Sequence, residues 1–212
     1  MKGNNIFYIC FYCEKEVEEK IVSYPSVLPK IDYIISKLKE NGNSVTVVSI
    51  APSKKGEFSG FEKTIDSKEK HIYIPSKICH SKILNRFMFL VHSFKIAKYL
   101  KDTVDRNSKI LVYHSLYNRF WLPIYHKLFK KDFYLEIEDV FSALDEKNKK
   151  YRKTEMRIFN MASGCLCIND LVSEKLNEIK NKVISYGSYD VPDIIFKPEK
   201  APIKIVYAGV IE

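Results

Sequence analysis

Glycine is scarce in this sequence of 212 residues, with only seven in the whole chain. No glycines are spaced as GxGxxG, and the GxxxxGK[ST] pattern is absent. Both motifs bring backbone N–H groups against phosphates, so their absence argues against a standard dinucleotide-dependent dehydrogenase and a P-loop kinase. A GxSxG nucleophile elbow is also missing, which weakens a hydrolase interpretation.

Long apolar runs are missing as well, since none approaches the roughly 20 residues needed to span a bilayer. The start, "MKGNNIFYICFYCEKEVEEK", has one short apolar run followed at once by acidic residues, without a small-residue cleavage site. That pattern argues against a signal peptide. With 46% hydrophobic and 13% aromatic residues, the chain can fill one large core, and we expect a globular, cytoplasmic protein.

Cysteine is infrequent and odd in number, with five spread through apolar segments. This usage fits reduced thiols better than a disulfide framework. Cys10 and Cys13 in "CFYC" have the spacing of a redox or half-zinc motif, but no second Cys or His pair follows at metal-site spacing. We therefore interpret both as core residues and predict no metal and no cofactor.

Acidic residues are outnumbered, with 35 Lys and Arg against 26 Asp and Glu and a net charge of +9. This balance favours anionic partners, which include nucleic acid, an anionic membrane surface and phosphorylated substrates. Charge alone does not choose among them. No nucleic-acid recognition motif is found, so nucleic acid is not an expected partner.

Apolar runs alternate with helical patterns along the chain, which predicts an α/β fold: a Rossmann-like parallel sheet of about seven strands flanked by helices. The predicted strands span residues 6–11, 44–50, 71–75, 109–114, 133–140, 165–169 and 182–187. The predicted helices span 28–38, 81–103, 117–130, 146–162 and 171–180. The polar stretch 52–70 is predicted to be a mobile loop.

Domain boundaries follow from composition. Residues 1–196 form the predicted Rossmann-like domain, and "KPEKAP" at 197–202 has the prolines and charges of a linker. Residues 203–212, which begin with an apolar run, are expected to be the first strand of a truncated second domain.

Polar residues follow several predicted strands. In an open parallel sheet, ligands bind beyond the carboxyl ends of the strands, so these residues are the candidates for a site. They are His114, Ser115, Tyr117, Asn118, Arg119, Glu136, Glu138, Asp139, Asn169, Asp170, Tyr186, Gly187 and Ser188.

His114 and the carboxylates of "EIED" each have two competing interpretations. His114 is either a hydrogen-bonding or acid/base group at the cleft or a strand-end histidine with satisfied hydrogen bonds. In "EIED", Glu136 and Glu138 share one face of a strand. Glu138 or Asp139 is either a site residue or part of a structural pair with Lys or Arg, because a buried carboxylate is costly unless paired.

Two basic, aromatic stretches, at 81–101 and 117–133, also have two interpretations. In the first stretch Ile83, Phe87, Leu90, Val91, Phe94 and Ala97 recur on one predicted helix face. Either these are two core-facing helices with solvated lysines, or they form a surface that leans on an anionic membrane.

The segment "KTEMRIFNMASGCLCINDLVSEKLNE" resembles GT-B glycosyltransferases of the group 1 type, in which a helix bearing a glutamate runs through a small residue into a strand. "VISYGSYD" resembles the next strand and its glycine turn, and "IKIVYAGVIE" resembles the strand and glycine that open the family's second domain. The resemblance follows the whole chain in element order and is most specific from about residue 150 onward.

The resemblance implies an N-terminal, acceptor-side domain of an enzyme that transfers a sugar, of hexosyltransferase type, from a nucleotide-sugar to a saccharide or lipid-linked acceptor. It also implies cell-surface polysaccharide biosynthesis, in the cytoplasm and peripheral to the inner membrane face. For such a reaction we predict Glu138, Asp139 and His114 as the catalytic residues, because they follow the predicted strands at the carboxyl edge of the sheet and have acid/base side chains. The implied acceptor contacts are Tyr117, Asn118, Arg119, Asn169 and Tyr186, and the nucleotide-sugar contacts are Gly187 and Gly209.

The chain departs from the family at two places. "SYPSVLPK" lacks the glycine-rich turn that meets donor phosphates in many relatives, so donor contacts from this half are in question. "EIEDV" occupies a place where many relatives have a histidine, so a carboxylate has that role or the catalytic group lies elsewhere. We expect little or no transferase activity from the 212 residues alone. The alternative function is a non-catalytic Rossmann-like module that binds a nucleotide or an anion.

Overall fold

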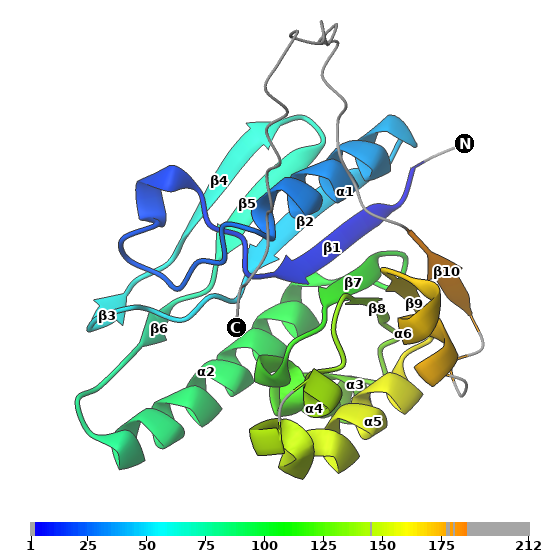
Figure 1. Ribbon diagram of the computed structural model, residues 1–212. Helices are drawn as coiled ribbons and strands as arrows, with labels where there is room; N and C mark the ends of the chain where they lie inside the picture. The colour runs from blue at the N-terminus through cyan, green and yellow to red at the C-terminus, as the bar shows by residue number, and fades with distance from the viewer. Residues whose placement is uncertain (1–2, 145, 177–178, 180, 186–212) are drawn as a thin grey trace, which may run out of the picture.

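The computed structural model describes residues 3–144, 146–176, 179 and 181–185 (Figure 1). Tyr186, Gly187, Gly209, the predicted linker at 197–202 and the predicted strand at 203–212 all lie outside the described residues. The proposed domain division therefore stays a prediction.

An eight-stranded sheet forms the centre of the fold, in the order β10-β9-β8-β7-β1-β2-β5-β4. Seven strands run parallel, and only β4 is antiparallel to its neighbour. The strands are β1 (Asn5–Cys10), β2 (Ser44–Ser49), β4 (Phe61–Asp66), β5 (Glu69–Tyr73), β7 (Lys109–Tyr113), β8 (Tyr134–Ile137), β9 (Gly164–Cys167) and β10 (Lys182–Ile184). The predicted α/β fold class is confirmed.

Helices connect the consecutive parallel strands, except that β2 and β5 are joined through β3 and β4. They are α1 (Leu28–Glu40), α2 (Lys82–Thr103), α3 (Trp121–Phe129), α4 (Phe141–Leu144), α5 (Arg152–Met161) and α6 (Asp170–Lys175). Short 3-10 turns are η1 (Lys15–Val17), η2 (Leu116–Arg119) and η3 (Glu146–Tyr151). In Figure 1, α1 lies above β1, and the group of α2, α3 and α5 lies below it.

The core gathers where these layers meet. β1 is central, and its residues from Phe7 to Cys10 are buried, which suits a strand covered on both faces. Trp121 of α3 is the largest side chain that is fully buried. Its indole N–H donates to the side-chain oxygen Oδ1 of Asn118 at 3.1 Å, so its burial leaves no donor unpaired.

The prediction of a mobile loop at 52–70 is wrong. This stretch contains β3 (Glu57–Phe58), which pairs with β6 (Ser76–Lys77), and β4, which forms an antiparallel edge on β5. Almost all of β4 is exposed and its sequence is "FEKTID", so it has no apolar alternation to reveal it. Charged edge strands resist edge-to-edge association, which explains this composition.

The interpretation of the first predicted helix face as core-facing is wrong for the first half of α2, where the large apolar residues are exposed. Ile83, Phe87, Leu90 and Phe94 are 82%, 57%, 47% and 55% exposed. The buried residues of α2 instead are His92, Ser93, Ile96, Ala97 and Leu100. The first turns of α2 extend past the sheet in Figure 1, and no helix or strand of the described residues covers their outer stripe. For α3 the core-facing interpretation is confirmed, since Trp121, Leu122 and Tyr125 are buried.

Among the described residues, no helix combines the length and the apolar content that crossing a membrane requires.

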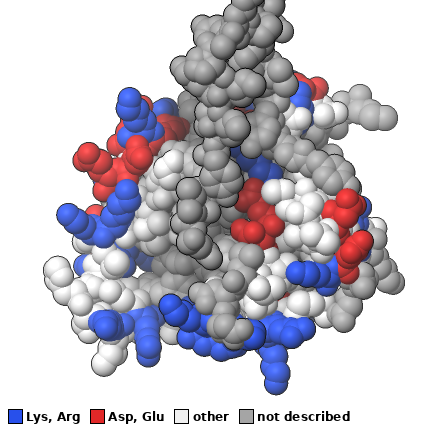
Figure 2. All heavy atoms as spheres, in the orientation of Figure 1, with Lys and Arg blue, Asp and Glu red and all other residues white. Residues whose placement is uncertain are grey.

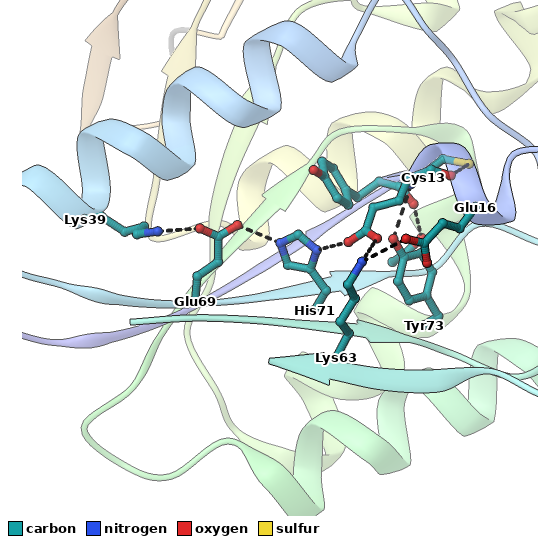
Figure 3. A network of polar contacts seen from close by, with 10 residues as sticks. Cys13, Glu16, Lys39, Lys63, Glu69, His71 and Tyr73 are labelled. Carbon is teal, nitrogen blue, oxygen red and sulfur yellow. Dashed lines mark hydrogen bonds and ion pairs between the residues drawn. The ribbon is translucent and has the colours of Figure 1, made fainter. Parts of the chain in front are cut away.

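A polar network fastens α1 and the loop after β1 to the edge of the sheet (Figure 3). The ring of His71, buried in β5, lies between two carboxylates: its Nδ1 is 2.6 Å from Glu14 Oε1 and its Nε2 is 2.7 Å from Glu69 Oε1. Lys63 of β4 contacts the other Glu14 oxygen at 2.5 Å, and Lys39 of α1 contacts Glu69 at 2.5 Å. Each acidic group therefore has a basic partner.

Glu14 makes this network sensitive to acid. Burial acts to raise its pKa, but hydrogen bonds from Lys63 and His71 outweigh burial and hold the pKa below its usual value. The stability from this group is therefore present above the carboxyl's unfolded pKa and is lost as pH falls through the lower folded pKa.

We predict that Glu14→Gln lowers the free energy of unfolding by about 1–3 kcal/mol near neutral pH, because His71 and Lys63 lose a charged acceptor. The difference from wild type should shrink in acid, where the wild-type carboxyl is also neutral. Urea unfolding near neutral pH and near pH 3 checks this. Glu16→Gln is the control, since Glu16 is 73% exposed and lies 3.4 Å from the same Lys63. An equal loss in both variants would contradict the prediction.

Candidate functional site

Polar side chains converge at the carboxyl end of the parallel strands. Glu136 belongs to β8, and Glu138 and Asp139 follow directly after it. Tyr8 of β1 and Tyr113 of β7 point to the same region, and Lys30 approaches from the first turn of α1. Because β8, β7 and β1 are consecutive in the sheet, their ends bring these residues together.

Glu136 is a fully buried carboxylate, with 0% of its surface exposed. Tyr8 donates its hydroxyl hydrogen to Oε2, and the Lys30 ammonium lies 3.0 Å from Oε1. Burial raises the pKa of Glu136, and Lys30 and Tyr8 act against that rise. Conversely, burial works to lower the pKa of Lys30, but Glu136 and Glu138 outweigh it and the pKa is raised. Lys30 therefore favours the ionised form of Glu136, and Glu136 favours the protonated form of Lys30.

Glu138 shares the same cation. Lys30 Nζ is 2.8 Å from Glu138 Oε1, and the Tyr113 hydroxyl donates to Glu138 Oε2 at 2.7 Å. Both oxygens of Glu138 thus have donors, which is the structural pairing that the sequence left open for this carboxylate. Its catalytic role stays a prediction.

Asp139 stands apart from this cluster. It is exposed, and no hydrogen bond or ion pair of its side chain is found among residues 3–144, 146–176, 179 and 181–185. Desolvation of the carboxyl group, followed by the adjacent charge of Glu138, raises its pKa. A carboxylate with open oxygens and a raised pKa is suited to accept a proton from a ligand hydroxyl.

His114 lies one residue beyond β7 and points to the opposite face of the sheet. Its Nε2 is 2.8 Å from Glu155 Oε1 of α5, and its side chain is 1% exposed. Burial acts to raise the pKa of Glu155, but hydrogen bonds from His114 and Ser142 outweigh it and lower the pKa. The buried Nδ1 has no hydrogen-bond partner among the described residues. The geometry therefore matches a buried strand-end histidine with one of its two ring nitrogens paired, rather than a group open to the cleft. The predicted catalytic role of His114 remains untested.

The predicted acceptor residues make different kinds of contact within the protein. The Asn118 amide donates to the Tyr113 carbonyl at 2.8 Å, and Asn169 caps α6 by accepting from the Val172 N–H at 2.9 Å. The Arg119 guanidinium lies 5.1 Å, 4.9 Å and 5.2 Å from the ring centroids of Phe89, Phe120 and Tyr151. Asn118 and Asn169 therefore already hold the backbone in place.

Tyr117 is different because it borders an open space. Its hydroxyl contacts Nδ1 of His92, whose pKa burial lowers to about 4, so the ring is neutral at physiological pH. Both residues line a cavity of about 230 Å³. The rest of the lining comes from the segment between η1 and α1, from the loop after β2, from β6 and the residue after it, and from α2: Val22, Pro52, Ser53, Ser76, Lys77, Ile78, Asn85, Met88 and Phe89. Among the predicted acceptor residues that are described, Tyr117 is the one in this lining.

Three residues of the site were not predicted: Tyr8, Lys30 and Tyr113. Lys30 could have been suspected, because it lies in the first turn of the helix after the first strand, at the same carboxyl edge as "EIED". Tyr8 and Tyr113 lie within apolar runs and give no signal of their own, since tyrosine is a common core residue.

Searches against protein-family models and against curated proteins found no match to this sequence. Solved structures do match the fold. An α,α-trehalose 6-phosphate synthase from Burkholderia multivorans matches with a TM-score of 0.54 and 8% identity, over 84% of this chain and 42% of that one. A UDP-forming α,α-trehalose-phosphate synthase from Burkholderia vietnamiensis matches with 0.52 and 7%, over 83% and 42%.

A trehalose-6-phosphate structure from E. coli, bound with UDP-2-fluoro glucose, also matches with a TM-score of 0.52 and 7% identity, over 83% and 42%. This chain therefore spans about two fifths of the length of the structures it matches. The likeness shows that the chain has the fold of one part of these GT-B glycosyltransferases.

We predict that Lys30→Met destabilises the protein by about 3–5 kcal/mol, because it leaves Glu136 buried without its cation. The double variant Lys30→Met with Glu136→Gln should recover much of this loss, since no unpaired charge remains at Glu136. Urea unfolding of the single and double variants measures both effects.

Lys98→Met serves as the control, because its ion pair with Asp102 is exposed, with 63% of the Lys98 side chain open to solvent. Exposed pairs contribute about 0–1 kcal/mol. A Lys30 variant no less stable than this control would contradict the assigned role.

Proposed function

We propose that this chain is the acceptor-side part of a glycosyltransferase that moves a hexose from a nucleotide-sugar donor to a saccharide or lipid-linked acceptor. The observation that carries the proposal is the carboxyl edge itself. There an open carboxylate, Asp139, stands beside a buried set of paired charges, on a fold shared with trehalose-phosphate synthases.

In the proposed reaction, a hydroxyl oxygen of the acceptor forms a bond to the anomeric carbon of the donor sugar. The bond from that carbon to the diphosphate oxygen breaks, and the nucleoside diphosphate leaves with the electron pair. Asp139 accepts the hydroxyl proton and later releases it to water. The Lys30, Glu136 and Glu138 cluster keeps the backbone around Asp139 rigid, so the carboxylate is held ready for the acceptor.

Support for the donor comes from the neighbours: one is UDP-forming, and another was solved with UDP-2-fluoro glucose bound. Because the chain spans about two fifths of their length, we propose that transfer needs residues beyond these 212. Gly187 and Gly209 remain predicted donor contacts. On this proposal the 212 residues by themselves bind acceptor and turn over little or not at all.

The net charge of +9 favours an acceptor that carries negative charge, such as a phosphorylated or diphosphate-linked saccharide. We propose a role in building a cell-surface polysaccharide, in which lipid-linked intermediates of this kind are the acceptors. Tyr117 and the cavity beside it are the proposed place for an apolar or sugar portion of the acceptor.

The activity is tested by incubating a form of the protein that includes a donor-side domain with a panel of nucleotide-sugars. The acceptors are sugar phosphates and lipid-linked saccharides. Acceptor-dependent release of nucleoside diphosphate would support the transferase. Binding of nucleotides without turnover over all these acceptors would favour the non-catalytic module instead. Affinity for nucleic acid that falls steeply with salt would contradict both.

We predict that Asp139→Asn lowers kcat by roughly 100-fold or more in the same assay, with the free energy of unfolding unchanged, because only a charged carboxylate accepts the proton. The raised pKa of Asp139 also predicts that the wild-type rate falls as pH drops through that pKa, where the carboxyl becomes protonated.

Asp132→Asn is the matched control, because Asp132 is an exposed aspartate near the other end of the same strand. Its rate should match wild type. A full rate in Asp139→Asn, or an equal loss in both variants, would rule out Asp139 as the base.

A further inference from the structure

An uncovered apolar stripe runs along the first half of α2. Ile83, Phe87, Leu90 and Phe94 recur at intervals of four, three and four residues, which places them on one side of the helix over about 16 Å. All four are exposed, from 47% to 82%. A row of large exposed apolar side chains is unusual on a free surface and marks a place of contact.

Basic residues border this stripe on both sides. Lys82 and Arg86 lie along one border, and Lys95 and Lys98 lie along the other, as 3.6 residues per turn require. From residue 76 to residue 101 the sequence contains no Asp or Glu. No ion pair of Lys82, Arg86 or Lys95 is found within the described part of the chain. Lys98 is paired with Asp102 at 2.9 Å, so the unbalanced positive charge along the stripe comes from Lys82, Arg86 and Lys95.

The stripe also lies on a projecting edge of the molecule, where an extended surface can contact it. The first turns of α2 project from the lower edge of the molecule in Figure 1. In Figure 2 this lower edge shows basic and uncharged atoms, whereas acidic atoms appear higher on the same face. Arg119 lies between the rings of Phe89 of α2 and Tyr151, so Tyr151 is close to α2. The exposed Arg152 and Lys153 directly follow Tyr151 and add positive charge near the helix.

We propose that the first half of α2 docks onto the surface of an anionic lipid bilayer. The helix lies in the plane of the interface, its four apolar side chains enter the boundary between headgroups and acyl chains, and the flanking cations meet the lipid phosphates. A second copy of the chain fits less well, since it would bring the same cations face to face. Docking places the cavity lined by Asn85, Met88 and Phe89 of the same helix near the bilayer.

This proposal is independent of transferase activity and is tested without any sugar donor. The 212-residue chain is floated with vesicles of phosphatidylcholine alone and with vesicles that also contain phosphatidylglycerol. We expect binding to the anionic vesicles, little binding to the neutral ones, and weaker binding as salt rises. No binding to anionic vesicles at low salt would overturn the proposal.

Two variants locate the contact. Phe87→Ser with Leu90→Ser removes the middle of the stripe, and Leu171→Ser is its control, because Leu171 is 68% exposed on α6. Arg86→Glu reverses one bordering charge, and Lys68→Glu makes the same change of charge in the turn between β4 and β5. We expect a roughly fivefold or greater loss of vesicle binding for the two α2 variants and little loss for the controls.

The circular dichroism of every variant should match wild type, because the substituted residues are exposed. Binding that falls equally in the controls would show general charge attraction instead of docking by α2. If the apolar variant abolishes self-association measured by light scattering while leaving vesicle binding intact, the stripe is an interface between copies, and the proposal fails.

Discussion

The buried carboxylate of Glu136 is the constraint around which the carboxyl edge of this fold is organised. A fully buried charge is tolerated only when opposite charge and hydrogen-bond donors surround it. Here the donor comes from β1, through Tyr8, and the charge comes from α1, through Lys30. One side chain on β8 therefore requires the correct position of the first helix and the first strand, more than a hundred residues earlier in the chain.

This arrangement separates the residues that hold the site from those free to act. Glu138 is paired with Lys30 and Tyr113, and His114 is paired with Glu155 on the opposite face. Asp139, the residue after Glu138, has no side-chain hydrogen bond or ion pair within the part of the chain that the structure describes. Our proposal assigns the chemistry to Asp139, which follows directly after this set of paired charges, because the paired groups cannot move without exposing unpaired charge.

Much of the fold was predictable because parallel strands buried on both faces read as continuous apolar runs. All seven predicted strands have counterparts in the sheet, and the carboxyl-end rule pointed to "EIED" before any contact was known. The hairpin at β4 was missed because its residues face solvent and carry charge. The outer face of α2 was misjudged for a related reason: helical spacing shows that apolar residues share a face, but not what covers it.

The sequence by itself determined the alternation of strands and helices, the parallel sheet and the basic charge, because these depend on local periodicity and composition. Only the tertiary structure decided which of the neighbouring carboxylates is paired and which is open. Lys30 and Glu138 are separated by more than a hundred residues, and no local pattern encodes their meeting. Only the tertiary structure, too, shows that the stripe of α2 is uncovered by the other described helices and strands, because exposure depends on where the other layers end.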